Sequence, residues 1–157
     1  MKKFNLQSPN ATLENLNHRT EIQGEDIFSA FDLKLTCEAT AEMAGYLLGM
    51  QDHKPDLWDG NEIADVKYYG LDGDISSKAE FKDCTVTFKD SKIIEAKVNK
   101  FKFHPITGNK IALTLRVQFR PDDEQIVEFS HLQRQSGGLV IEADKHFEPG
   151  IGVQTTI

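Results

Sequence analysis

The stretch from Ile111 to Ser136 constrains the fold of this chain most, because a strand pattern passes directly into a helix pattern. Apolar residues take every second position from Ile111 to Phe119, with mostly polar residues between them, which is the period of a half-buried strand. Pro121 ends the strand. Asp122 is then suited to cap the start of a helix, and Gln125 at the third helical position completes a capping box.

The helix that follows is predicted to pack on the core through one apolar stripe, formed by Ile126, Phe129 and Leu132. Gly137 and Gly138 predict its end. A similar unit lies 80 residues earlier, where Leu33, Leu35 and Cys37 alternate with polar residues. A second short helix is predicted after Thr40, on the helical spacing of three apolar residues, Met43, Leu47 and Met50.

The sequence between the two units predicts a β-hairpin of residues 81–98 that turns at Asp90 and Ser91. Ile94, Ala96 and Val98 are expected on its buried face, and a change of phase near Asn99 predicts a β-bulge. Two strand-helix units with a hairpin between them indicate an α+β fold, mostly antiparallel β, built as a sandwich or curved sheet with two helices.

The two ends of the chain add further strands to this interpretation. Residues 3–7 predict a short strand, and residues 11–22 a polar extended segment anchored by Leu13, Leu16 and Ile22. Alternation from Leu139 to Ala143 predicts a last strand. The length of 157 residues is that of one ordinary domain, so residues 1–157 are assigned to a single domain.

Composition sets the expected compartment and the state of the cysteines. The chain has 39% apolar and 27% charged residues, no run approaching the roughly 20 apolar residues of a membrane span, and no apolar segment of a signal peptide. A cytoplasmic location is expected. Cys37 and Cys84 lie on the apolar phase of their strands and are predicted to be reduced core residues.

Catalytic and cofactor motifs are missing from the sequence. It contains no nucleophile elbow, no phosphate-binding glycine loop, no dinucleotide fingerprint and no zinc-protease motif. Its five histidines are scattered without the local pairing of metal ligands. The sequence therefore predicts a protein that is not an enzyme and has no cofactor and no metal.

Charge is unevenly distributed along the chain, whose net charge is −7. The segment 52–74 holds seven acidic residues and two lysines, whereas the segment 89–110 holds six lysines and two acidic residues. These are either solvated faces or two binding surfaces of opposite sign. The candidate protein-binding residues of the acidic segment are Asp52, Asp56, Trp58, Asp59, Glu62 and Asp65. Trp58 either pins this segment to the core or anchors an interface.

Lysines and aromatic residues alternate in the basic segment. Lysines can follow a phosphate backbone while aromatic rings stack on bases, as in proteins that bind single-stranded nucleic acid. The candidate nucleic-acid-binding residues are Lys97, Lys100, Phe101, Lys102, Phe103 and His104. In the other interpretation, the phenylalanines belong to the core and the lysines only protect an exposed strand from aggregation.

Residues 15–26 and 32–35, together with residues 115–118 and 121–125, resemble a group of small uncharacterised proteins encoded by bacteriophages and prophages. The resemblance covers most of the chain. It implies a phage origin and a bacterial cytoplasmic setting, and it carries over no catalytic residues.

Three functions are therefore considered. The first is a non-catalytic phage protein that binds and modulates a host or phage macromolecular complex, for example an anti-CRISPR-like inhibitor of host defence. The alternative is a single-stranded DNA-binding or recombination accessory protein. An enzyme built from scattered histidines and carboxylates is the least supported, because no spacing of these residues indicates one.

Overall fold

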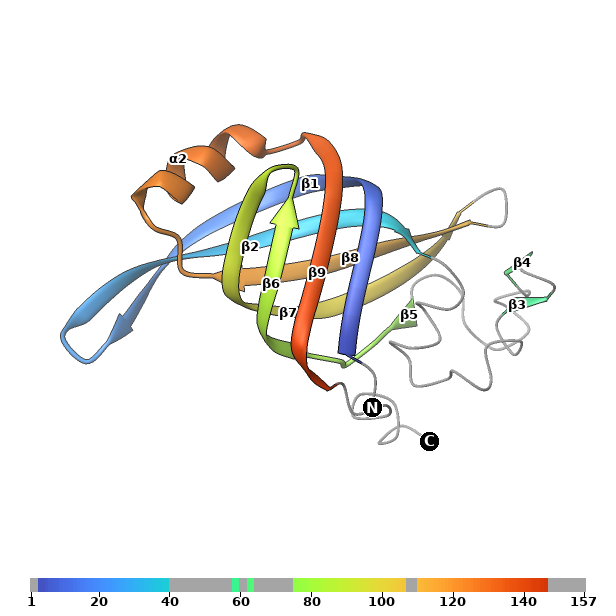
Figure 1. Ribbon diagram of the computed structural model, residues 1–157, viewed down its shortest axis with the longest axis horizontal. Helices are drawn as coiled ribbons and strands as arrows, with labels where there is room; N and C mark the ends of the chain where they lie inside the picture. The colour runs from blue at the N-terminus through green and yellow to red at the C-terminus, as the bar shows by residue number, and fades with distance from the viewer. Residues whose placement is uncertain (1–2, 40–57, 60–61, 64–74, 107–109, 147–157) are drawn as a thin grey trace.

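The computed structural model describes residues 3–39, 58–59, 62–63, 75–106 and 110–146, most of which form antiparallel strands (Figure 1). The strands are β1 (Lys3–Gln23), β2 (Asp26–Ala39), β3 (Trp58–Asp59), β4 (Glu62–Ile63), β5 (Ile75–Ser76), β6 (Phe81–Phe88), β7 (Ser91–Ile106), β8 (Lys110–Phe119) and β9 (Ser136–His146). The helix α2 (Asp123–Leu132) lies between β8 and β9. No helix in these residues is long and apolar enough to cross a membrane.

Six strands close into a barrel. Around the barrel, adjacent strands follow the order β7, β6, β9, β1, β2, β8, and β8 pairs with β7 to close the sheet. Every one of these six strands therefore has a partner on both sides. All of the pairings are antiparallel. The short β5 pairs with β7, and β3 with β4 forms a separate two-stranded hairpin.

The predicted fold class is therefore wrong in its architecture, since the sheet closes on itself instead of forming a sandwich or an open curved sheet. Three residues of β6 and β7 lie at or beside register shifts and have left-handed φ angles, namely Asp83 (55°), Glu95 (55°) and Lys100 (58°). Bulges of this kind bend a strand and increase its twist, which helps a sheet to close. The described residues hold one helix and not two; the second was predicted in residues 40–50, which lie outside the described residues.

The alternation predicted in β2 and β8 is confirmed. The two strands lie side by side, with Leu33 opposite Val117 and Leu35 opposite Leu115, and these four side chains are buried in the core. Burying apolar side chains from every strand around a closed sheet supplies the main stabilisation of such a fold.

Both cysteines are free and buried, as predicted. Burial raises the pKa of the Cys37 thiol to about 11, although a hydrogen bond with Ser8 opposes the shift. A thiol with so high a pKa stays protonated and unreactive at neutral pH.

The start of α2 is confirmed and its predicted end is wrong. The backbone N–H of Gln125 donates to Asp122 Oδ1 at 2.8 Å, and the Asp122 N–H donates to Gln125 Oε1 at 3.0 Å, which completes the capping box. The helix ends at Leu132, and Gly137 and Gly138 belong to β9. A side chain at position 137 would collide with the Lys89 side chain, so close packing and not a helix end accounts for that glycine.

The hairpin of β6 and β7 and the bulge near Asn99 are confirmed. The buried face of β7 differs from the prediction in one residue, because Ile93 is buried and Ile94 is 63% exposed. The left-handed Glu95 adds a residue on the exposed side, and Ala96 and Val98 then return to the core.

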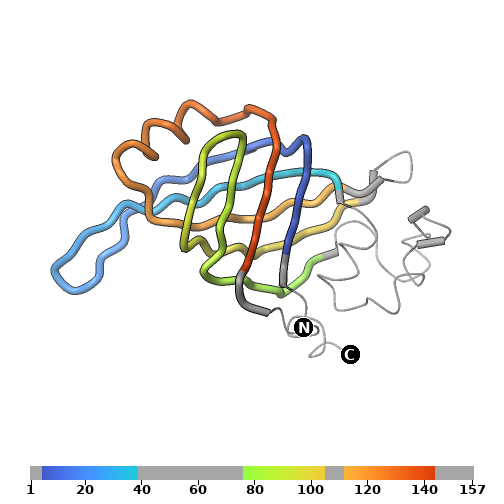
Figure 2. Tube along the Cα trace, in the orientation of Figure 1, coloured from blue at the N-terminus to red at the C-terminus, as the bar shows by residue number. Residues whose placement is uncertain are grey.

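β1 is one strand of 21 residues, and its second half pairs with β2 in a long hairpin that extends away from the barrel (Figure 2). At the end of this hairpin Ile22 lies opposite Ile27, and the two side chains are 74% and 71% exposed. The prediction that Ile22 anchors the segment is therefore wrong, because the hairpin carries it beyond the core.

Candidate functional site

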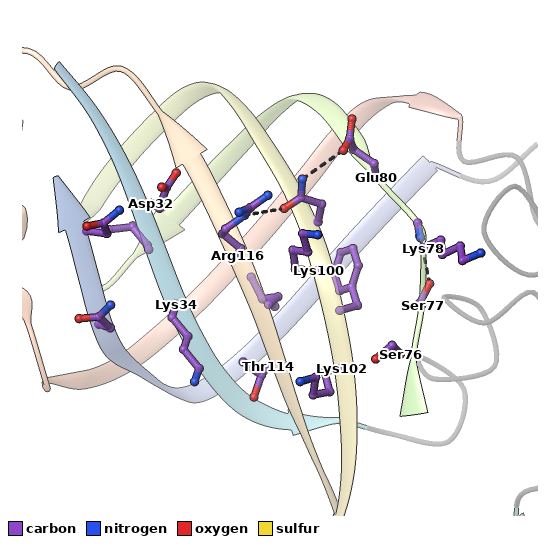
Figure 3. Close-up of a pocket in the computed structure, with 17 residues that line it drawn as sticks. Asp32, Lys34, Ser76, Ser77, Lys78, Glu80, Lys100, Lys102, Thr114 and Arg116 are labelled. Atoms are coloured by element: carbon purple, nitrogen blue, oxygen red, sulfur yellow. Dashed lines mark hydrogen bonds between the residues drawn. The ribbon is translucent and has the colours of Figure 1, made fainter. Parts of the chain in front are cut away.

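The outer surface of β2, β8 and β7 carries an open hollow of about 840 Å³. We call it the basic groove, because five cationic side chains and only two acidic ones line it. The cations are Lys34, Lys78, Lys100, Lys102 and Arg116, and the acids are Asp32 and Glu80. The segment between β5 and β6 forms the side of the groove beyond β7 (Figure 3).

Strand register sets two of these cations against each other. Lys34 of β2 is the direct cross-strand partner of Arg116 of β8. Like charges directly opposite each other on a sheet are destabilising. An anion bound in the groove would offset this concentration of positive charge, so the pair favours a site for a negatively charged ligand.

Arg116 is held in place by a hydrogen-bonded chain (Figure 3). Arg116 Nε donates to Asn99 Oδ1 at 3.0 Å, and Asn99 Nδ2 donates to Glu80 Oε2 at 3.1 Å. Asn99 is 5% exposed, so this link is sheltered from water. These hydrogen bonds use only the Nε of the Arg116 guanidinium. Its two terminal nitrogens have no partner in the described residues. A positioned guanidinium with unused donors is suited to bind a phosphate or a carboxylate.

The two acids do not cancel the positive charge of the groove. Arg19 donates from Nε to Asp32 Oδ2 at 2.8 Å, and Gln118 Nε2 donates to Asp32 Oδ1 at 2.8 Å. Burial by itself would raise the pKa of Asp32, but the hydrogen bonds from Arg19 and Gln118 outweigh it and hold the pKa below its ordinary value. Asp32 is thus ionised and already paired with Arg19, which does not line the groove, and Glu80 accepts a hydrogen bond from the neutral amide of Asn99. The groove keeps its excess of positive charge because its five cations outnumber these two acids.

Three lysines of the groove have no hydrogen bond or ion pair with the described residues. They are Lys34, Lys78 and Lys100, and all three are exposed. Lys100 owes its position to the bulge, in which Lys100 and Phe101 together face a single residue of β8. The bulge thereby directs Lys100 and Lys102 to the outer surface and returns Phe101 to the core.

The predicted nucleic-acid-binding residues are divided by the barrel wall. Lys100 and Lys102 line the groove, and Lys97 lines a second hollow beside it. Phe101 and Phe103 are 1% and 0% exposed, so they pack in the core and present no ring for stacking on a base. His104 is exposed and lines neither hollow.

Three of the six predicted protein-binding residues lie outside the part of the chain that the structure describes, namely Asp52, Asp56 and Asp65. The backbones of Trp58, Asp59 and Glu62 form β3 and β4, with Trp58 opposite Ile63. The two interpretations of Trp58, core plug and interface anchor, both remain predictions.

Lys34, Lys78 and Arg116 were not among the predicted site residues. Their only sequence signal is a position on the polar phase of a strand or in a loop, and many solvated lysines and arginines share that position. The groove appears only when β2, β8 and β7 are placed side by side.

Metal ligands are not gathered anywhere in the described residues, which hold no group of three or more His, Cys, Asp or Glu side chains that could bind a metal ion. Comparisons of the chain with protein-family models, with curated proteins and with solved structures find no match. The function proposed below therefore rests on the residues and geometry of this chain alone.

Proposed function

We propose that this protein binds single-stranded nucleic acid, without catalysis, through the basic groove. The observation that carries the proposal is the cluster of five cationic side chains in one hollow, in which Lys34 and Arg116 occupy directly opposite positions of β2 and β8. Lys78 and Lys100 add exposed ammonium groups along the same hollow. Binding of a phosphodiester backbone depends mainly on such clustered cations.

A single strand suits this groove better than a duplex. The net charge of the chain is −7, so a broad contact with duplex DNA would bring acidic surface against phosphate. The groove instead confines its cations to one hollow. Exposed or half-buried amide and hydroxyl side chains lie among them and can bond the free edges of unpaired bases, namely Asn15, Asn17, Ser76 and Thr114.

The test measures the salt dependence of binding to a fluorescent oligothymidylate. Each phosphate contact on a single strand contributes roughly −0.7 to the slope of log K against log salt. The triple variant Lys34→Gln, Lys78→Gln, Lys100→Asn should therefore bind more weakly, with a slope smaller in magnitude by about 2. Asn is chosen at position 100 because it tolerates the left-handed backbone there.

The matched control is the triple variant Lys82→Gln, Lys92→Gln, Arg134→Gln. It changes the net charge equally, and these exposed side chains line neither hollow. The control should keep the affinity and slope of the unchanged protein. Equal effects of the two triple variants, or no binding even at low salt, would refute the proposal.

We also propose a second function, the binding and modulation of a host or phage protein complex in the bacterial cytoplasm, in keeping with the phage resemblance. Its support is the exposed pair Ile22 and Ile27 at the end of the β1–β2 hairpin, because adjacent exposed apolar side chains often mark protein interfaces.

The variant Ile22→Thr, Ile27→Thr should lose a protein partner captured from a bacterial lysate while keeping its oligonucleotide affinity. Ile94→Thr, also at an exposed position, is the control. Capture that is equal in both variants would count against this second function.

A further inference from the structure

The second hollow, of about 570 Å³, lies at the root of the β1–β2 hairpin and continues the basic groove, because Arg116 lines both. Four cations and two acids line it, namely Arg19, Lys97, Arg116, Arg120, Glu21 and Glu95. A strand that leaves the groove past Arg116 along β8 therefore reaches Arg120, which directly follows the end of β8.

Arg120 is fixed in orientation by three contacts with the hairpin. Its Nε donates to Glu21 Oε1 at 3.1 Å, and its Nη2 donates to Gln23 Oε1 at 3.4 Å. Its guanidinium carbon lies 4.1 Å from the centre of the Phe28 ring. The hydrogen bonds from Arg19 and Arg120 hold the pKa of Glu21 below its ordinary value, so this carboxylate stays charged and keeps its hold on Arg120.

This arrangement presents a flat, oriented surface. Phe28 covers one face of the guanidinium, no other ring in the described residues contacts it, and the Arg120 side chain is 47% exposed. Guanidinium planes and aromatic rings are the surfaces on which proteins stack unpaired bases. The stacking surface that the sequence suggested at Phe101 and Phe103 is thus available at Arg120 and Phe28 instead.

We propose that Arg120, stacked on Phe28, is a base-stacking platform for the single strand whose backbone lies in the basic groove. This inference rests on the proposed nucleic-acid function and adds a second point of contact to it. The groove holds phosphates by charge, and the platform holds a base by its flat face. Binding should therefore strengthen when an oligonucleotide is long enough to reach from one hollow to the other.

The test uses an oligothymidylate that contains one 2-aminopurine, whose fluorescence is quenched when the base stacks. The label is placed at different positions in a series of oligonucleotides, and the unchanged protein should quench its fluorescence in at least one of them. Arg120→Lys keeps the charge but removes the plane. It should abolish the quenching and weaken binding about fivefold or more, with the salt slope unchanged.

A second variant, Phe28→Leu, keeps the apolar volume but releases the guanidinium from its support, and it should reduce quenching in the same direction. Arg134→Lys, at an exposed position that lines neither hollow, is the control. An unchanged circular dichroism spectrum will show that the Arg120→Lys protein is folded. If Arg120→Lys fails to fold, Phe28→Leu provides the test instead.

The two proposals fail in different ways. If quenching and affinity are unaffected by both Arg120→Lys and Phe28→Leu while the groove lysines still control binding, the platform is refuted and the nucleic-acid function stands. If the unchanged protein binds no oligonucleotide, both are refuted.

Discussion

The barrel and the hairpin that extends from it are held by different forces. In the barrel, β2 and β8 bury a continuous set of apolar side chains, among them Leu33, Leu35 and Leu115. Beyond the barrel the same strand β2 pairs with β1, and Ile22 and Ile27 are exposed. There the side chains that join the hairpin to the barrel are mostly charged.

The ion pairs at the root of the hairpin form one connected set. Arg19 contacts both Glu21 and Asp32, and Arg120 of the barrel contacts Glu21. The comparison shows that one strand, β2, belongs to two regions whose stability responds differently to pH and salt. Apolar burial is insensitive to pH, whereas ion pairs weaken with acid and with salt. The hairpin, which positions the proposed stacking platform, is therefore the part that solution conditions can loosen.

The largest expected effect is in the barrel core. Phe129 of α2 is fully buried and packs edge-on against Phe119, with 5.4 Å between ring centres. Phe129→Ala should lower the free energy of unfolding by about 3–5 kcal/mol, measured by urea denaturation. The control is Val127→Ala, because Val127 is on the same helix and 59% exposed; it should change stability by less than about 0.5 kcal/mol. Equal effects would show that α2 does not pack through Phe129.

The next effect is local to the hairpin. Asp32→Asn would set an amide nitrogen against the N–H groups of Arg19, so the opening of the hairpin should become easier by about 1–3 kcal/mol. Hydrogen exchange would detect this at the amides of residues 19–21, with little change in β6. Asp26→Asn, at the exposed turn, is the control. A uniform rise in exchange over the whole barrel would contradict the separation of the two regions.

Acid should loosen the hairpin reversibly, by a similar or smaller amount, because a protonated carboxyl group can still accept a hydrogen bond. The pKa values of Asp32 and Glu21 are lowered in the folded protein from ordinary values of 3.8 and 4.5. Below these values the unfolded state binds more protons than the folded state, so the stabilisation is complete above about pH 5 and is lost as pH falls through the folded pKa values.

The measurement is the protection factor of the hairpin amides between pH 7 and pH 3. Asp32→Asn should flatten the pH dependence, leaving the part due to Glu21. Protection that does not change over this range would show that the ion pairs contribute nothing to the closed hairpin.

The smallest effect is expected at the start of α2. Asp122→Ala removes the hydrogen bond from the Gln125 N–H and should lower stability by about 0.5–2 kcal/mol. Asp123→Ala, in the first turn but outside the cap, should cost less, because it changes only the interaction with the helix dipole. A denaturation midpoint that is lower for Asp123→Ala than for Asp122→Ala would contradict the cap.

Local rules were sufficient for several elements of this fold. The strands around Leu33 and Leu115, the Asp122 cap and the hairpin at Asp90 all depend on neighbours within a few positions in the chain, and each is confirmed. The bulge near Asn99 could also be predicted, because an extra residue leaves a visible break in the period of two.

The site was predicted only in part. Lys100 and Lys102 were found because they belong to a basic segment, but the placement of Phe101 and Phe103 in the core depends on which face of β7 turns inward. Arg116 was read as the polar phase of a scaffold strand. Arg116 became a candidate ligand-binding residue only because the fold places it opposite Lys34, which is 82 positions away in the chain.

By itself, the sequence determined where strands alternate, where the helix begins and which segment of the chain is basic, because these depend on short-range periodicity, capping and composition. The tertiary structure alone decided that the sheet closes and which cations meet on its surface. Closure and register depend on pairings between residues far apart in sequence, such as those of β1 with β9 and of β2 with β8. A one-residue change in such a register would exchange the inner and outer faces of a strand, and no local pattern specifies the partner against which that register is set.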